Sequence, residues 1–228
     1  MNNNKSFKLL LSIFIITLAG CNSAQSGNEE MVDDIGVISE KSTTELIKIL
    51  ERAGDTNDPA GVAFWDVIKE LEKRGQSASD AAPALAKAIT YPRRDSGMAG
   101  IALISMGESA KSAIPILAKN LDHERADVRE NSSFILGNIG NLAECSVPKL
   151  GNLLWDKDPA VRSTAATAIE AITNIDLIED DYHEIDPKGY GSAVLDEPEG
   201  TITQYARTWW VESGQFMKWS NENCGIVE

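Results

Sequence analysis

One pattern recurs along this chain every 32 or 33 residues, and no other feature of the sequence restricts the fold as strongly. Gly75, Gly107 and Gly140 mark the same point in three successive copies. Small residues, a proline and a leucine follow each glycine at fixed distances. These matched positions are Ala78, Ala110 and Ala143; Ala81, Ala113 and Ser146; Pro83, Pro115 and Pro148; and Leu85, Leu117 and Leu150. A period of this length is typical of a solenoid built from small supersecondary units.

Each copy of the pattern predicts two helices joined by a polar turn. The first helix has its proline in the first turn, where backbone N–H groups lack helical acceptors in any case. The second helix has apolar side chains at helical spacing, as in Val128, Ile135 and Ile139. Asp158 and Pro159 supply an N-cap residue and a first helical residue in the last copy. We expect the glycine that follows a second helix to close it in the left-handed conformation.

The same chemistry predicts one further copy before Gly75. Residues 58–60 (Asp-Pro-Ala) repeat residues 158–160, which lie 100 residues, or about three periods, further on. The two apolar stripes of this copy are Leu46, Ile47 and Leu50, and Gly61, Trp65, Ile68 and Leu71. Four units therefore span residues 42–174 and predict an all-α fold, an α-solenoid of about four helical hairpins.

These repeats resemble HEAT repeats, and in particular the short HEAT-like repeats of the phycobilisome-lyase type. The resemblance rests on the Gly-Ala-Pro-Leu frame and on the segments ADVRENSSFILGNIG and PAVRSTAATAIEAIT. It implies a solenoid in which each helix pair buries one face against its neighbours. It also implies that Arg129 and Arg162 tie one repeat to the next through a carboxylate. Ser96-Gly97 replaces the Val-Arg pair in the second unit, so we expect an irregular start to that second helix.

A cluster of charged residues at 122–130, DHERADVRE, contains the residue types of a metal or catalytic site. However, Asp127 lies where an acid stabilises the beginning of a helix. His123 has no histidine counterpart in the other units, and Asp156 takes its place in the last one. We therefore interpret the cluster as structural and His123 as a solvated turn residue rather than a ligand or a base.

The first residues predict a lipoprotein signal peptide, residues 1–20. Lys5 and Lys8 precede an apolar run, residues 9–18, that is shorter than the roughly 20 residues a membrane span needs. The motif LAGC, ending at Cys21, resembles the bacterial lipobox and implies cleavage before Cys21 and its acylation, with palmitate among the acyl chains. Such chains anchor a protein stably. Residues 21–41 predict a flexible acidic tether. We expect a cell-envelope protein, on the outer membrane facing the periplasm if the host is Gram-negative.

Charge and cysteine content restrict the partners and the compartment. The formal net charge is −14 and falls to −16 when signal cleavage removes two lysines. This excess of acid excludes nucleic acid and anionic headgroups as charge-driven partners. With Cys21 acylated, Cys145 and Cys224 remain in a compartment that permits disulfides. They either form a bridge or stay as two unpaired thiols, because sequence alone does not show whether they meet.

Two segments follow the repeats. Residues 175–200 predict an acidic loop, and Asp180, Asp181 and His183 in it raise the question of calcium or zinc. The spacing lacks the EF-hand frame and no second imidazole or thiol is near, so we expect no metal and no cofactor. Residues 201–228 contain Trp209, Trp210 and Trp219, and predict a helical segment that caps the last repeat. An exposed aromatic anchor for a partner is the alternative.

No motif of a known catalytic class occurs in the chain, so we do not expect an enzyme. The sequence favours a scaffold or adaptor that binds an envelope or periplasmic protein through its second helices. The expected contact residues are Glu130, Ser133, Ser163 and Glu170. Two alternatives stay open. One is an enzyme, or a subunit of one, related to the lyase-type HEAT-like proteins, and the other is a structural envelope protein that associates with itself.

Overall fold

The structure is a computed structural model that describes residues 36–55, 63–177 and 201–220, together with Cys224. The predicted signal peptide, Cys21, and most of the predicted tether and acidic loop lie outside these ranges. The chain divides into two units, residues 1–38 and 39–228, and the short 3₁₀ helix η1 (Ile38–Glu40) spans the boundary. All helical repeats lie in the second unit.

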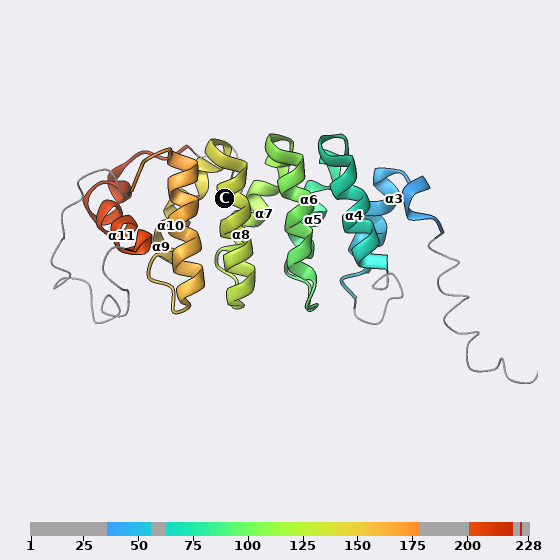
Figure 1. The fold of residues 1–228 in the computed structure, drawn as a ribbon, viewed down its shortest axis with the longest axis horizontal. Helices are drawn as coiled ribbons and strands as arrows, with labels where there is room; N and C mark the ends of the chain where they lie inside the picture. The colour runs from blue at the N-terminus through green and yellow to red at the C-terminus, as the bar shows by residue number, and fades with distance from the viewer. Residues whose placement is uncertain (1–35, 56–62, 178–200, 221–223, 225–228) are drawn as a thin grey trace, which may run out of the picture. The chain divides into compact units, whose positions relative to one another are not determined.

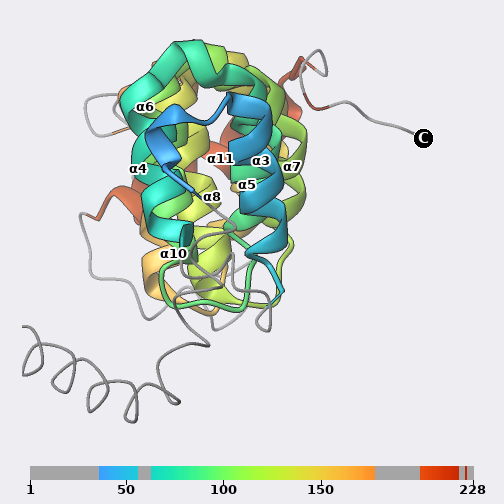
Figure 2. The ribbon, with the colours of Figure 1, turned by 90° about the vertical axis from the view of Figure 1, so that its right-hand side faces the viewer.

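Every regular element in the described residues is a helix, which confirms the predicted all-α class. The first helices of the four hairpins are α3 (Thr43–Arg52), α5 (Ala82–Ala88), α7 (Ile114–Asn120) and α9 (Val147–Leu153). The second helices are α4 (Phe64–Arg74), α6 (Ala99–Met106), α8 (Ala126–Ile139) and α10 (Pro159–Thr173). The second helices stand side by side in one layer, and α3, α5 and α7 lie in the other (Figures 1 and 2).

Each repeat is joined to the next by a seven-residue 3₁₀ segment that begins with the repeated glycine. These connections are η3 (Gly75–Ala81), η5 (Gly107–Ala113) and η6 (Gly140–Ser146). In η3 the non-helical Ala78 (φ −107°, ψ 21°) interrupts the segment. The three glycines have φ of 53°, 56° and 75°, but their ψ lies between −127° and −145°. The predicted left-handed closure is therefore wrong in detail, because this backbone region is open to glycine and strained for other residues. Asn174 does adopt the left-handed conformation, after α10.

The second repeat shows the irregularity that the sequence predicts. A 3₁₀ turn, η4 (Ser96–Met98), precedes the shortened α6, which confirms the expected uneven start. Residues 96–120 are also apolar enough, by length and composition, to cross a membrane. In the structure this segment is divided among η4, α6, η5 and α7 and contributes Leu103, Met106 and Leu117 to the core between the layers. We therefore attribute its apolar character to burial within the repeats.

Polar side chains also join each repeat to the one before it. They donate hydrogen bonds to backbone carbonyls that lie 31 to 34 positions away, or about one repeat. The pairs are Ser105 Oγ with the Glu72 carbonyl (3.2 Å), Asn120 Nδ2 with Ala86 (3.1 Å), Arg125 Nη1 with Tyr91 (2.9 Å) and Lys149 Nζ with Ala118 (3.1 Å). Because these bonds recur along the stack, they help to fix the register between neighbouring repeats.

The end of the stack is covered by α11 (Ile202–Glu212) and the 3₁₀ helix η8 (Gly214–Phe216). Trp209 and Trp210 are buried, and Trp210 lies so close to Gly151 of α9 that a Cβ there would be 2.4 Å from its ring. Arg207 Nε donates to the carbonyl of Leu154 at 2.7 Å. These residues form a cap on the last repeat.

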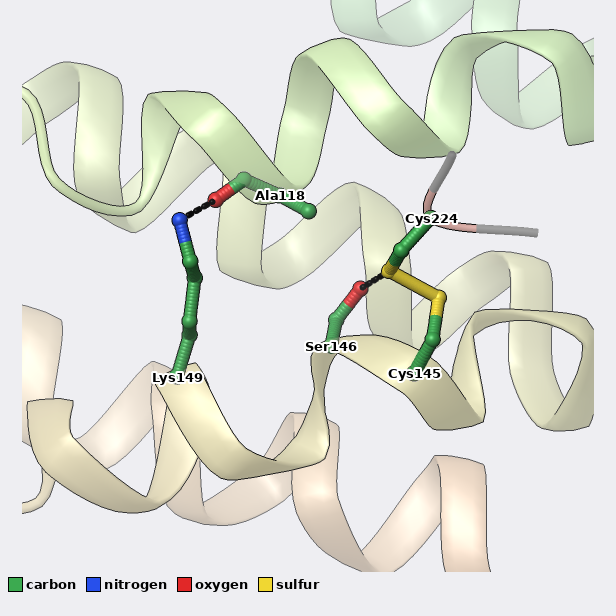
Figure 3. Close-up of a disulfide and its surroundings, with 5 residues drawn as sticks. All are labelled: Ala118, Cys145, Ser146, Lys149 and Cys224. Atoms are coloured by element: carbon green, nitrogen blue, oxygen red, sulfur yellow. Dashed lines mark hydrogen bonds between the residues drawn. A yellow bond between two sulfur atoms is a disulfide. The ribbon is translucent and has the colours of Figure 1, made fainter. Parts of the chain in front are cut away.

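A disulfide fixes the chain beyond this cap. The structure joins Cys145 of η6 to Cys224, two cysteines whose pairing the sequence left open (Figure 3). Ser146 Oγ lies 3.8 Å from Cys224 Sγ at the same junction. Trp219 Nε1 donates to the Gly214 carbonyl at 3.0 Å, and its ring meets Trp209 edge-on. Covalent and packing contacts therefore act together at this end.

Candidate functional site

The charged cluster at 122–130 forms the turn before α8. His123 Nδ1 accepts a hydrogen bond from the backbone N–H of Arg125 at 3.1 Å. In the next repeat Asp156 Oδ1 accepts from the backbone N–H of Asp158 at 2.9 Å, which is the same bond at the equivalent position. His123 is also half-buried. It therefore takes part in the hydrogen bonding of its turn and is not simply a solvated residue.

Arg129 and Asp156 link the third repeat to the fourth. Arg129 Nε and Nη2 each lie 2.7 Å from a different oxygen of Asp156, and the two side chains are only 7% and 9% exposed. Arg129 Nη1 also donates to the carbonyls of His123 and Glu124. Arg162 Nη1 donates to the carbonyls of Asp156 and Lys157, within its own repeat.

Two opposing effects set the pKa of Asp156. Burial alone would raise this pKa, because it removes the carboxylate from water. The hydrogen bonds from Arg129 and from the Asp158 N–H, with the charges of Arg129 and Lys157, outweigh burial and hold the pKa below its usual value. The Asp156 carboxylate is thus held in a buried structural joint between the third and fourth repeats.

Of the four residues predicted to contact a partner, Ser163 is exposed, while Glu130 and Glu170 are half-buried. Ser133 is fully buried, so that part of the prediction is wrong. Its hydroxyl donates to the carbonyl of Arg129 at 2.8 Å. The position lies at the joint between successive second helices: at the equivalent place in α6, a Cβ on Gly100 would be 2.8 Å from Ile135 of α8.

Large apolar side chains, which the sequence analysis missed, lie on the free side of the second helices. Phe134 of α8 is 53% exposed and Ile101 of α6 is 37% exposed. Both stand six residues before the glycine that ends their helix, and Lys69 and Thr167 occupy that position in α4 and α10. All four are exposed. Counting from the repeated glycine would have revealed this row.

Trp65 belongs to the same side of the molecule. The sequence analysis placed it on a buried stripe, but it is 38% exposed and the neighbouring Phe64 is buried instead. Lys69, one turn further along α4, holds its ammonium 5.2 Å from the centroid of the Trp65 ring. Trp65 is equivalent to Gly97, Glu130 and Ser163 in the next three second helices. We call these two rows, Lys69–Ile101–Phe134–Thr167 and Trp65–Gly97–Glu130–Ser163, the second-helix face.

Small residues bring the helices of this face close together. A Cβ on Gly97 would be 2.9 Å from Asn131 of α8, and one on Gly137 would be 3.0 Å from the Cα of Ala168 of α10. A larger side chain at Gly137 would force α8 and α10 apart, whereas one at Gly97, in η4, would meet the movable end of the Asn131 side chain. The two rows are therefore held on closely packed, rigid elements.

The described residues contain no group of three or more His, Cys, Asp or Glu that could hold a metal ion. Asp180, Asp181 and His183, which the sequence analysis considered for calcium or zinc, fall outside the ranges that the structure describes. Within those ranges, the feature best suited to a function is the second-helix face.

The fold and this face together define a class of protein, the α-solenoid built from helical hairpins. The family model of the HEAT repeat matches residues 147–175, which form the fourth hairpin, α9 with α10, and the first residues after it. This match supports a HEAT-repeat protein. A search of curated proteins finds no match.

A comparison with solved structures gives a crystal structure of an engineered protein from the Northeast Structural Genomics Consortium, target OR329. It is 17% identical, and the alignment covers 84% of this chain and 93% of the engineered one with a TM-score of 0.41.

Proposed function

We propose that this chain is a lipid-anchored scaffold of the bacterial cell envelope that binds a partner protein through its second-helix face. The observation that carries the proposal is the exposure of Phe134, Ile101 and Trp65 on one side of a rigid stack of repeats. Exposed apolar side chains gathered on one surface are typical of protein contacts. In this proposal the chain binds without catalysing a reaction. Its repeats are short HEAT-like repeats.

The anchor in this proposal is the lipid expected on Cys21, with residues 22–40 as the tether. The disulfide between Cys145 and Cys224 supports a location outside the cytoplasm, because such bonds persist in oxidising compartments. In a Gram-negative host the protein would stand on the outer membrane and face the periplasm. A scaffold of this design needs no cofactor, since it acts by shape and by the residues it presents.

The proposal is tested by crosslinking intact cells and capturing the protein with its bound partner. Four forms are compared: the natural chain, Cys21→Ser, the double variant Ile101→Ser with Phe134→Ser, and Phe216→Ser. Phe216 is 76% exposed but lies on η8, away from the second-helix face, and so serves as the matched control.

We expect the natural chain and Phe216→Ser each to capture one partner protein, in an amount nearly equal to that of the captured chain. It should be lost from the Ile101/Phe134 double variant, and Cys21→Ser should lose both the membrane fraction and the partner. Capture that does not change in the double variant would contradict a role for this face. A Cys21→Ser protein that stays in the membrane fraction would contradict the lipid anchor.

A further inference from the structure

The spacing of the second-helix face limits the kind of segment that could lie across it. Packed helices stand about 8–10 Å apart. Gly100 of α6 lies against Ile135 of α8, and Gly137 of α8 lies against Ala168 of α10. Ile101 and Phe134 hold the same position in adjacent helices, so one helix spacing separates their attachment points. In an α-helix, residues seven apart are on one face and about 10.5 Å from each other. A helix laid across the second helices could therefore place such a pair against Ile101 and Phe134.

An extended segment whose apolar side chains have a similar separation would suit this face less well than a helix. Its backbone N–H and C=O groups would need partners, since a strand cannot satisfy them internally. The side-chain amides of Asn131 and Asn138, about one turn before and after Phe134, each use one donor within α8. Asn131 Nδ2 donates to the carbonyl of Asp127 at 2.7 Å, and Asn138 Nδ2 donates to the carbonyl of Phe134 at 2.8 Å. A helix satisfies its own backbone and needs only side-chain contacts here.

The charges around Ile101 and Phe134 are acidic. α6 carries no charged residue. On α8, Glu130 lies one turn before Phe134, Arg129 is buried against Asp156, and Asp127 is paired with Arg125. On α10, Glu170 follows Thr167 by three residues, and it accepts a hydrogen bond from the backbone N–H of Leu177 at 3.3 Å.

Basic residues also lie on the second helices: Arg162 of α10 is half-buried and donates to the carbonyls of Asp156 and Lys157. Lys69 and Lys73 are on α4, where Lys69 lies over Trp65 and Lys73 pairs with Glu70. The centre of the face thus combines two apolar side chains with Glu130 and Glu170, in a chain whose net charge is −14.

We propose that the second-helix face binds a basic amphipathic α-helix of the partner protein. Two apolar residues seven apart in that helix lie against Ile101 and Phe134, and flanking lysine or arginine side chains lie near Glu130 and Glu170. This inference rests on the proposed function and names the chemistry of the segment that the scaffold recognises.

Binding of designed peptides to the full chain carrying Cys21→Ser tests this inference. Three fluorescent helical peptides of about 20 residues, enough for two turns on each side of the contact, are compared by anisotropy. The first has leucine at every seventh position and lysine on the flanks, and the second has glutamate in place of the lysines. The third has the composition of the first in an order that scatters the leucines around the helix.

We expect the lysine-flanked peptide to bind about tenfold more tightly than the glutamate-flanked one at about 0.15 M ionic strength, because two partly exposed charge pairs change from attraction to repulsion. Glu130→Lys with Glu170→Lys should abolish or reverse that preference. Phe134→Ser should weaken binding of the lysine-flanked peptide at least about tenfold, as expected for loss of a central aromatic contact. Phe216→Ser should leave that binding unchanged. The scattered peptide should bind poorly.

Equal binding of the lysine-flanked and glutamate-flanked peptides would overturn the inference, as would binding that Phe134→Ser does not affect. Loss of the cellular partner in the Ile101/Phe134 double variant, together with no binding of any peptide, would also overturn it while leaving the proposed function in place. If the double variant also keeps its cellular partner, the proposed function fails as well.

Discussion

At the scale of single residues, the clearest feature is the buried pair of Arg129 and Asp156. The sequence resemblance implied a carboxylate partner for Arg129 but did not say which one. The structure supplies Asp156, 27 residues further on, which at the same time closes the turn before α10. His123 occupies the equivalent position in the third repeat. Both side chains accept the same backbone hydrogen bond in their turns, and for this role a histidine and an aspartate are equally suitable.

Asp156→Asn should lower the free energy of unfolding by about 3–5 kcal/mol at pH 7, because it leaves Arg129 buried without its counter-charge. The folded state holds the pKa of Asp156 below the ordinary value of 3.8. The stability that the Asp156 carboxylate contributes is therefore fully present above the ordinary pKa, and it is lost as the pH falls through the lowered pKa of the folded state. Urea unfolding of both proteins at pH 7 and at about pH 3 checks this, and the difference between them should shrink at the lower pH.

Asp127→Asn is the matched control for this prediction. Asp127 is paired with Arg125, but its side chain is 56% exposed, so its loss should cost less than about 1 kcal/mol. An equal loss of stability in the two variants would contradict the special role of the buried pair.

A second residue-scale prediction concerns Ser132, which is buried and whose hydroxyl has no hydrogen-bond partner among the residues that the structure describes. Ala99 and Ala165 stand at the equivalent positions of α6 and α10 and are also buried. Ser132→Ala should therefore raise the free energy of unfolding by about 1–2 kcal/mol, since it removes an unpaired polar group. Ser133→Ala should give no gain, because that hydroxyl donates to Arg129. Thermal unfolding of both variants checks the contrast, and a destabilised Ser132→Ala would refute it.

At the scale of secondary-structure elements, the glycine that joins successive repeats decides the geometry. The sequence showed its period and its place at the end of a helix, so the helical hairpins could be predicted. It did not show the seven-residue 3₁₀ helix that follows, because alanine, serine and proline are equally compatible with an α-helical start. Tertiary packing decides that detail: Ala110 and Ala113 of η5 are completely buried.

Gly140→Ala isolates the backbone contribution of this joint. A Cβ at Gly140 would meet no atom within 4 Å, so the change introduces strain at φ of 75° and no clash. We expect a loss of about 1–3 kcal/mol, measured by urea unfolding. Asn141→Ala, at the exposed neighbouring position, should change stability by less than about 0.5 kcal/mol. Tolerance of alanine at position 140 would show that the joint is not restricted to glycine.

At the scale of the whole described unit, the solenoid class could be predicted because the repeat period fixes it, and the structure confirms it. The exposed residues of the second-helix face could not be predicted in the same way. Helical spacing alone assigned Trp65 to the core and Ser133 to the surface, and both assignments are wrong. A helix that packs on a first helix and on two neighbouring second helices has several buried stripes. A single apolar period cannot separate those stripes from an exposed one.

The disulfide gives a prediction at this scale. Cysteines 79 positions apart enclose α9, α10 and α11, so the bond restricts a long loop of the unfolded chain. Cys145→Ser with Cys224→Ser should lower the free energy of unfolding by about 4 kcal/mol, with the cap still in place through Trp209 and Trp210. Unfolding in urea, with and without dithiothreitol, provides the measurement. The reductant should destabilise the natural chain by a similar amount and leave the double variant unchanged; a double variant as stable as the natural chain would contradict this.

Site-specific photo-crosslinking in intact cells tests the central claim most directly, that the second-helix face meets a partner protein. A photoreactive phenylalanine analogue is placed at position 134, at position 101 or, as the control, at exposed position 216. The account predicts one crosslinked product, of the same mass from positions 134 and 101, and none from position 216. No product from 134 and 101, or the same product from all three positions, would contradict it.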